Sequence, residues 1–147
     1  MREESISKEN QALIEKYSQL KHSLYSKLGR ISLYRSSAED QSRKVKVRRA
    51  LDNSEEIVIN LLLLLRKVQD RARDRKLLNF IILIKRTLEE LTVAVNLLLC
   101  HKPSPVLEKI DALIINLENA NELLEQILEV KPKKDYKTVK MMAAVGR

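Results

Sequence analysis

The sequence predicts an all-α protein, an antiparallel four-helix bundle with coiled-coil-like heptad packing and a short basic C-terminal tail. Two glycines and three prolines in 147 residues leave little material for the turns that a β-sheet requires. Leu, Lys, Glu and Arg, which favour helices, are abundant throughout the chain. The third observation is the spacing of the apolar residues, which recur at alternating steps of three and four residues. A chain of this length buries about 70% of its unfolded surface, so we expect one domain over residues 1–130.

The first helix is predicted at about residues 5–33, and its apolar stripe is the narrowest. Its seam consists of Ile6, Asn10, Leu13, Tyr17, Leu20 and Leu24. A narrow stripe between polar flanks is weakly held by its own chain, so we expect this helix to be exchangeable or to face a partner helix. The residues expected in that contact are Leu13, Tyr17, Leu20 and Leu24. An amide on the seam, here Asn10, can fix the register of a helix pair; a frayed first turn is the alternative.

The second and third helices are predicted at about residues 38–72 and 76–100. The seam of the second consists of Val47, Leu51, Ser54, Val58, Leu61, Leu65, Val68 and Ala72. The seam of the third consists of Leu77, Ile81, Ile84, Leu88, Leu91, Val95 and Leu98. A second apolar column beside each seam suits a helix with two neighbours. Ala72 and Leu77 are five residues apart, which puts the seams out of phase and predicts a turn near residues 73–76; one long bent helix is the alternative.

The fourth helix is predicted at about residues 105–130, and a basic tail follows at 131–147. Its seam consists of Val106, Ile110, Leu113, Leu117, Ala120, Leu124 and Ile127. Ser104 is a candidate N-cap, with Pro105 at the first helical position. In the first connection, at residues 34–40, Ser36 or Ser37 is the candidate cap. The sequence "KPKK" at 131–134 is expected to end the fourth helix.

The net charge of +8 is unevenly distributed. Residues 104–130 carry one Lys and six acids, a balance of −5, so the other residues carry +13. Bases concentrate in the runs 43–49 and 66–76 and in the tail. Two interpretations are open: the bases pair with the acidic fourth helix within the bundle, or they attract an acidic protein, anionic lipid or nucleic acid. The residues expected to bind an acidic partner are Arg43, Lys44, Lys46, Arg48, Arg49, Lys131, Lys133 and Lys134.

The most apolar segment, residues 55–100, does not predict a membrane span. A span needs about 20 predominantly apolar residues, and the longest uncharged run in the first half of this segment, Ile57–Leu65, has nine. The single cysteine excludes an intramolecular disulfide, and the polar opening "MREESISKEN" is unlike a signal peptide. We therefore expect a protein that is not transmembrane and is intracellular, either cytoplasmic or nuclear.

The sequence offers few groups for catalysis or metal binding. Its two histidines are His22 and His101, and the latter adjoins Cys100. Adjacent residues in a helix point about 100° apart, so this pair is not expected to share a metal or a proton. We expect Cys100 to be a buried small apolar residue. Glu118, Glu122, Glu125 and Glu129 recur on one helix face, and we interpret them as a solvated face. The prediction is a protein that is not an enzyme and takes no cofactor, metal or small-molecule substrate.

The predicted function is a non-enzymatic helical scaffold or adaptor that mediates protein–protein interaction, as a subunit of a larger multiprotein assembly. Its partners would be other helical proteins or a second copy of itself, because the apolar stripes exceed what one small bundle needs to cover. The alternative is electrostatic binding of nucleic acid or an anionic membrane surface through residues 43–49 and 131–147. With 3% aromatic residues, a platform for stacking nucleic-acid bases is not expected.

Overall fold

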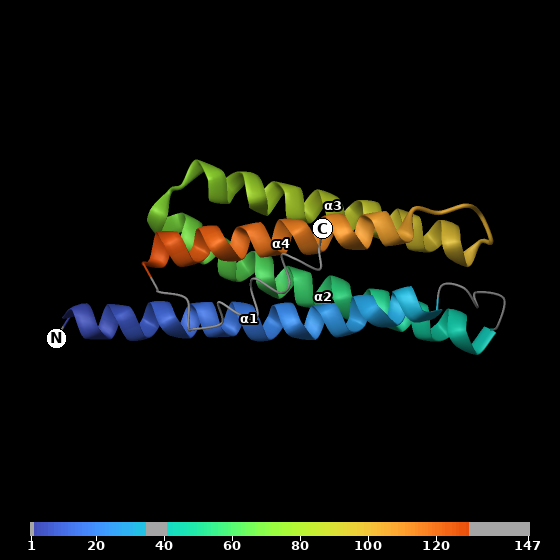
Figure 1. Cartoon of the computed structure of the whole chain (residues 1–147), viewed down its shortest axis with the longest axis horizontal. Coiled ribbons are helices and arrows are strands. Elements are labelled where there is room, and N and C mark those ends of the chain that lie inside the picture. Colours follow the sequence, from blue (N-terminus) through green and yellow to red (C-terminus); the bar gives the residue numbers. More distant parts are fainter. Residues whose placement is uncertain (1, 35–40, 130–147) are drawn as a thin grey trace, which may run out of the picture.

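The computed structural model describes residues 2–34 and 41–129, and the side chains of residues 8–34 and 42–129. It consists of four helices in these ranges, α1 (Arg2–Tyr34), α2 (Gln41–Ala72), α3 (Arg75–Leu99) and α4 (Val106–Leu128) (Figure 1). The described part of the chain contains no strand, so the all-α prediction is confirmed. Predictions for Ser36, Ser37 and the tail at 131–147, including Lys131, Lys133 and Lys134, lie outside the described residues.

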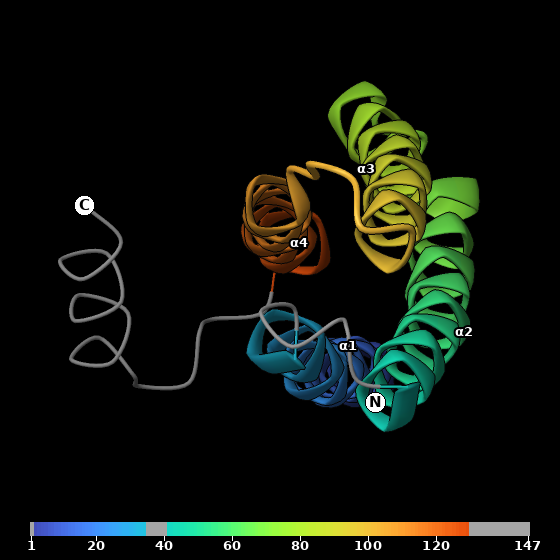
Figure 2. The same cartoon turned by 90° about the vertical axis from the view of Figure 1, so that its right-hand side faces the viewer.

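The helices pack as a ring in which each makes its main contacts with two others. α1 packs against α2 and α4, and α3 packs against the same two helices. Viewed along the long axis, the four helices occupy four corners (Figure 2). Figure 1 shows that the chain reverses its direction along the molecule at each connection. In keeping with this path, Asn10 near the start of α1 donates through Nδ2 to the carbonyl of Leu128 at the end of α4, at 3.1 Å.

The residues that recur every three or four positions form the core between these helices. On α2 every predicted seam residue is buried except Ala72, which is exposed. On α3 and α4 the seam residues are buried, apart from Leu88, Leu98 and Ile127, which are half-buried. Fully burying one Leu or Ile side chain stabilises a fold by about 1.5–3 kcal/mol. Burial of the apolar seams therefore provides the main force that holds the helices together.

A sharp turn separates α2 from α3, as predicted, so the alternative of one long bent helix is wrong. Arg73 has a left-handed backbone, with φ of 48°. The Asp74 carboxylate then caps α3 by accepting hydrogen bonds from the backbone amides of Lys76 at 2.8 Å and Leu77 at 3.1 Å. Together these two residues end one helix and start the next without a glycine or proline.

Two predictions about the connection between α3 and α4 are wrong. Ser104 does not cap α4: its hydroxyl donates to the carbonyl of Ala94 on α3, and the N-cap position is occupied by Pro105. Cys100 is exposed, because it forms the C-cap of α3 and follows the last residue of the helix. The neighbouring His101 has a left-handed backbone, with φ of 58°, which turns the chain toward α4.

Candidate functional site

The four residues predicted to bind a partner helix divide into two pairs. Tyr17 and Leu24, one heptad apart, are fully buried inside the bundle. Leu13 and Leu20, also one heptad apart, are half-buried and pack at the edge of the core. Tyr17 and Leu24 are therefore core residues of this chain and could reach a partner only if α1 left the bundle. Leu13 and Leu20 are the pair that stays partly accessible while α1 is packed in the bundle.

Leu13 and Leu20 line an open groove between α1 and α2, which we call the α1–α2 groove. Its volume is about 360 Å³. Its lining consists of Leu13, Lys16, Leu20, Asn60, Leu63, Leu64 and Lys67. Leu63 is 58% exposed, which leaves one of the apolar walls uncovered. The groove thus has leucine walls from both helices and a lysine from each helix at its rim.

A second hollow, of about 230 Å³, continues the groove toward the turn between α2 and α3. It shares Leu13 and Lys67 with the first hollow and reaches the last turn of α4. Its other lining residues are Asn10, Val68, Arg71, Ala72, Ile127 and Leu128. The combined groove follows α1 from residue 10 to residue 20, which is about three helical turns.

The rim of the α1–α2 groove is positively charged. Lys16 and Lys67 are exposed, and neither has an acidic partner among residues 8–34 and 42–129. Arg71 forms an ion pair with Glu9, with 3.0 Å between Nη2 and Oε1. Because the two lysines flank apolar walls, acidic groups on the flanks of an apolar ligand would meet complementary charge here.

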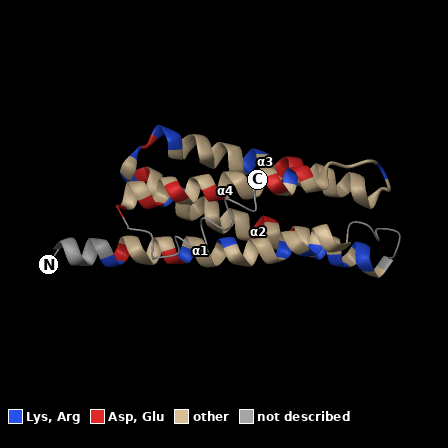
Figure 3. Cartoon of the chain, in the orientation of Figure 1, with Lys and Arg blue, Asp and Glu red and all other residues tan. Residues whose placement is uncertain are grey.

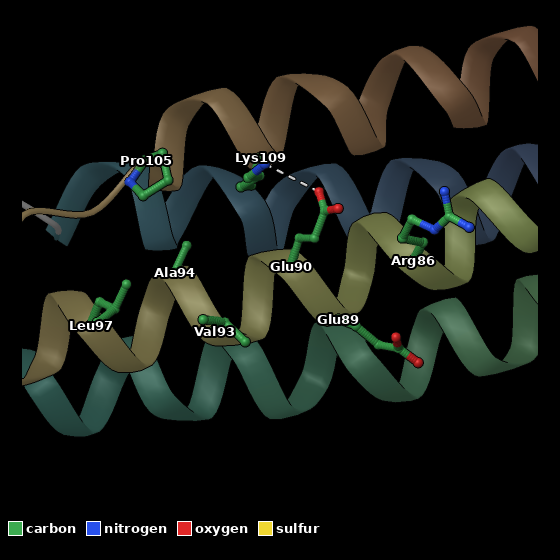
Figure 4. Close-up of a pocket in the computed structure, with 8 residues that line it drawn as sticks. All are labelled: Arg86, Glu89, Glu90, Val93, Ala94, Leu97, Pro105 and Lys109. Atoms are coloured by element: carbon green, nitrogen blue, oxygen red, sulfur yellow. Dashed lines mark hydrogen bonds and ion pairs between the residues drawn. The ribbon is translucent and has the colours of Figure 1, made fainter.

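A third hollow, of about 290 Å³, lies between α3 and α4 (Figure 4). Its lining consists of Arg86, Glu89, Glu90, Val93, Ala94, Leu97, Pro105 and Lys109. Lys109 bridges the two helices through its ammonium group, 3.1 Å from Oε2 of Glu90. With two bases and two acids in its lining, this hollow has no net charge to select a partner.

A polar cluster interrupts the apolar contact between α1 and α4. Lys21 is only 7% exposed, and its ammonium group lies 3.0 Å from Oε1 of Glu118. The hydroxyl of Tyr25 donates to the same oxygen at 2.6 Å. The hydroxyl of Tyr17 donates to the backbone carbonyl of Leu117 at 2.7 Å. Buried polar groups of this kind are tolerated because each finds a partner.

The expected solvated face of α4 is only partly solvated. Glu122 and Glu129 are exposed, as predicted, whereas Glu118 and Glu125 are half-buried against α1. Glu125 accepts a hydrogen bond from Nδ2 of Asn121 at 3.1 Å. Oδ1 of Asn121 is buried and has no hydrogen-bond partner among the described residues. The prediction is thus corrected for Glu118 and Glu125, which belong to the interface between α1 and α4.

The polar cluster changes the proton affinity of its members. Burial raises the pKa of the Tyr17 hydroxyl, and the negative charge of Glu118 raises it further. Burial also raises the pKa of Tyr25, reinforced by its hydrogen bond to Glu118. For Glu125, burial raises the pKa most, while the Asn121 amide and the Lys21 charge act in the opposite direction. The cluster therefore favours the protonated, neutral form of Tyr17 and Tyr25 over the phenolate.

The sequence contains a signal for this cluster that the periodicity analysis missed. Tyr17, Lys21 and Tyr25 are spaced by four residues, which places Lys21 and Tyr25 on the same side of α1 as the seam residue Tyr17. Glu118 follows Leu117 of the α4 seam and so lies beside it. Polar side chains in line with a core seam indicate that these side chains find hydrogen-bond partners in the folded chain. Which groups they bond to depends on the helix that packs alongside.

The basic run at 43–49 lies on the first turns of α2, at the end where α1 finishes (Figure 3). Four of its five bases are exposed and Lys44 is half-buried. The Lys46 ammonium lies 5.4 Å from the centre of the Tyr34 ring. Because α2 packs against α1 and α3, this run does not follow the acidic face of α4. The basic run at 66–76 lies at the opposite end of α2.

The remaining polar groups of the described residues form no metal cluster, since no three His, Cys, Asp or Glu side chains among them gather closely enough to hold an ion. No helix within the described ranges has both the length and the apolar character needed to cross a membrane. No protein-family model matches the chain, and neither a curated protein nor a solved structure matches it.

Proposed function

We propose that this chain is a non-enzymatic helical scaffold or adaptor that binds one helix of a partner protein, or of a second copy, in the α1–α2 groove. It would act as a subunit of a larger multiprotein assembly. The observation that carries this proposal is the α1–α2 groove itself, with its leucine walls and a rim of two lysines that have no acidic partner among residues 8–34 and 42–129. We further propose that the four helices form an antiparallel bundle of the coiled-coil type, which presents this groove as a rigid surface.

The dimensions of the groove suit a helix. An amphipathic helix that binds in a groove inserts side chains at positions i, i+3 or i+4 and i+7, which spans about two turns. The combined groove is about three turns long and carries apolar side chains along both walls, from Leu20 and Leu63 to Leu13 and Val68. Two or three apolar anchors of a partner helix would cover the exposed surface of Leu63.

The charge of the rim indicates which helices fit. Lys16 on α1 and Lys67 on α2 line the groove together with the leucines. A partner helix with acidic residues beside its apolar anchors would pair with both lysines, whereas a basic helix would be repelled. The basic segment 131–147 of this chain carries six bases and one acid, so its charge does not suit this groove.

The test compares two substitutions of equally exposed residues on different helices. Leu63 in the groove and Ile115 on α4 are both 58% exposed. Leu63→Asp introduces a charge into the apolar contact and should remove partner binding, whereas Ile115→Asp should leave it intact. Proximity labelling in the organism of origin, with wild type and both variants, identifies the proteins whose labelling depends on Leu63.

Light scattering on the purified chain distinguishes the two kinds of partner. A dimeric wild type that becomes monomeric on Leu63→Asp, but not on Ile115→Asp, shows that the partner is a second copy. Thermal unfolding of both variants serves as the folding control, since surface substitutions are expected to change stability by less than about 0.5 kcal/mol. If Leu63→Asp folds and retains every neighbour and the oligomeric state of the wild type, the proposal is wrong.

A further inference from the structure

Figure 1 shows the end of the molecule where α1 finishes and α2 begins. Two large apolar side chains are exposed there. Leu33, in the last turn of α1, is 67% exposed. Val45, in the second turn of α2, is 56% exposed. Both are close in sequence to the connection at 35–40, so they lie at the same end of the bundle. We call this end, formed by residues 27–34 and 42–51, the basic tip.

The basic tip concentrates positive charge around these two side chains. Residues 27–34 and 42–51 contain seven bases and no acid. Arg30, Arg48 and Arg49 are exposed among them, and Figure 3 shows Lys and Arg gathered at this end of α1 and α2. The charge therefore lies at the same end of the molecule as the exposed apolar groups.

We infer that the basic tip docks on a membrane surface that contains anionic lipid. Amphipathic surfaces of this kind place cations among the lipid headgroups and apolar side chains at the boundary of the acyl chains. Anionic lipid attracts each Lys or Arg that comes within a Debye length of the surface. Leu33 and Val45 supply the apolar contact, and the surrounding bases supply the attraction.

A nucleic acid fits the basic tip less well. Its phosphates would pair with the bases, but they offer no apolar environment for Leu33 and Val45. Stacking of bases would need an exposed aromatic ring, and the one aromatic ring at the tip, Tyr34, is half-buried and lies 5.4 Å from the Lys46 ammonium. The combination of exposed apolar and cationic side chains is what favours a bilayer.

This inference is independent of the proposed function. The α1–α2 groove and the hollow that continues it extend from Asn60 to Ala72 on α2, whereas the bases of the tip occupy residues 43–49 at the other end of the helix. A bundle held by its tip on a bilayer would leave the groove open to a partner. Either activity can therefore be lost without the other.

The test is co-sedimentation of the full chain with phosphatidylcholine vesicles, with and without phosphatidylserine. Wild type should bind only the vesicles that contain phosphatidylserine, and binding should weaken as salt is added. Arg48→Glu with Arg49→Glu should weaken binding by about tenfold or more, since each cation near the surface contributes a factor of about five. Leu33→Ser with Val45→Ser should weaken vesicle binding and leave binding to duplex DNA unchanged.

The matched control is Lys16→Glu with Lys67→Glu, which makes the same change of net charge in the α1–α2 groove. This control should bind phosphatidylserine vesicles nearly as tightly as wild type does. Only its lower net charge should weaken the binding, and only slightly. Circular dichroism establishes that every variant is folded. The inference is overturned if the control weakens binding as much as Arg48→Glu with Arg49→Glu, if Leu33→Ser with Val45→Ser has no effect on vesicles, or if wild type prefers duplex DNA to the vesicles.

Discussion

Among the residues whose side chains the structure describes, Lys21 is the one charged side chain that is buried. Lysines are almost never fully buried unless they are paired, and Lys21 is 7% exposed between α1 and α4. Its pairing with Glu118, which also accepts from Tyr25, makes this position acceptable. Burying two charges removes them from water, and this costs free energy. The attraction within a single ion pair rarely exceeds that cost. We therefore expect the cluster to specify which face of α4 meets α1 more than to stabilise the fold.

This role predicts an asymmetry between single and double substitutions. Glu118→Ala leaves the Lys21 charge buried without a partner, and we expect it to lower the free energy of unfolding by about 1–3 kcal/mol. Lys21→Met combined with Glu118→Met removes both charges, and its stability should fall within about 1 kcal/mol of wild type. Chemical denaturation of the single and double variants measures this. A double variant that is as unstable as Glu118→Ala would show that the ion pair itself stabilises the bundle.

The buried tyrosines predict instability at alkaline pH. The pKa of Tyr17 and of Tyr25 is raised above the ordinary value of 10.0 in the folded chain. Above pH 10 the unfolded chain therefore loses these protons while the folded chain keeps them, so the free energy of unfolding falls as pH rises. Tyr17→Phe combined with Tyr25→Phe should flatten this fall. Equal slopes for wild type and variant between neutral pH and pH 11 would contradict the assignment.

At the scale of the helix, α1 shows what a periodic pattern can and cannot predict. Leu13 and Leu20 form one column of its stripe, and Tyr17 and Leu24 form the other. The pattern predicts that both columns are apolar, but the neighbouring helices decide which is covered. α4 and α2 close over Tyr17 and Leu24, while Leu13 and Leu20 remain at the edge. The sequence could therefore predict the helix and its stripe but not the open groove.

The turn between α2 and α3 allows the contribution of a single N-cap to stability to be predicted. Asp74 satisfies two amides at the start of α3, and removing an N-cap carboxylate typically costs about 1 kcal/mol. Asp74→Ala should lower the denaturation midpoint accordingly. Asp70→Ala is the matched control, because Asp70 is an exposed acid one turn earlier on α2 and should change stability by less than about 0.5 kcal/mol. Equal effects of the two substitutions would mean that the cap does not hold the turn.

At the scale of the whole molecule, the sequence predicted where the helices lie along the chain better than it predicted which helices pack side by side. Alternating steps of three and four apolar residues are a local property, so the four helices and the turn near residue 73 could be anticipated. The contact of Lys21 with Glu118 joins residues 97 positions apart (118 − 21), and no local pattern encodes it. The same holds for the α1–α2 groove, whose walls come from residues 13–20 and 60–67.

The arrangement of the molecule separates its two candidate surfaces. The α1–α2 groove lies near the turn between α2 and α3, and the basic tip lies at the other end of α2. α2 rises by about 1.5 Å per residue, and this length separates the two surfaces. Both can therefore be occupied at the same time. A bundle with both surfaces engaged would connect a partner helix to an anionic surface, which is the role of an adaptor.

Photo-crosslinking in the organism of origin tests the partner-binding groove most directly. A photoreactive residue is placed at position 63 in the groove, or at position 115 on α4, where the native Leu63 and Ile115 are equally exposed. The groove predicts a covalent adduct from position 63, joined to an apolar segment of helix with acidic flanks, and none from position 115. Adducts from position 115 with none from position 63 would contradict the proposed site.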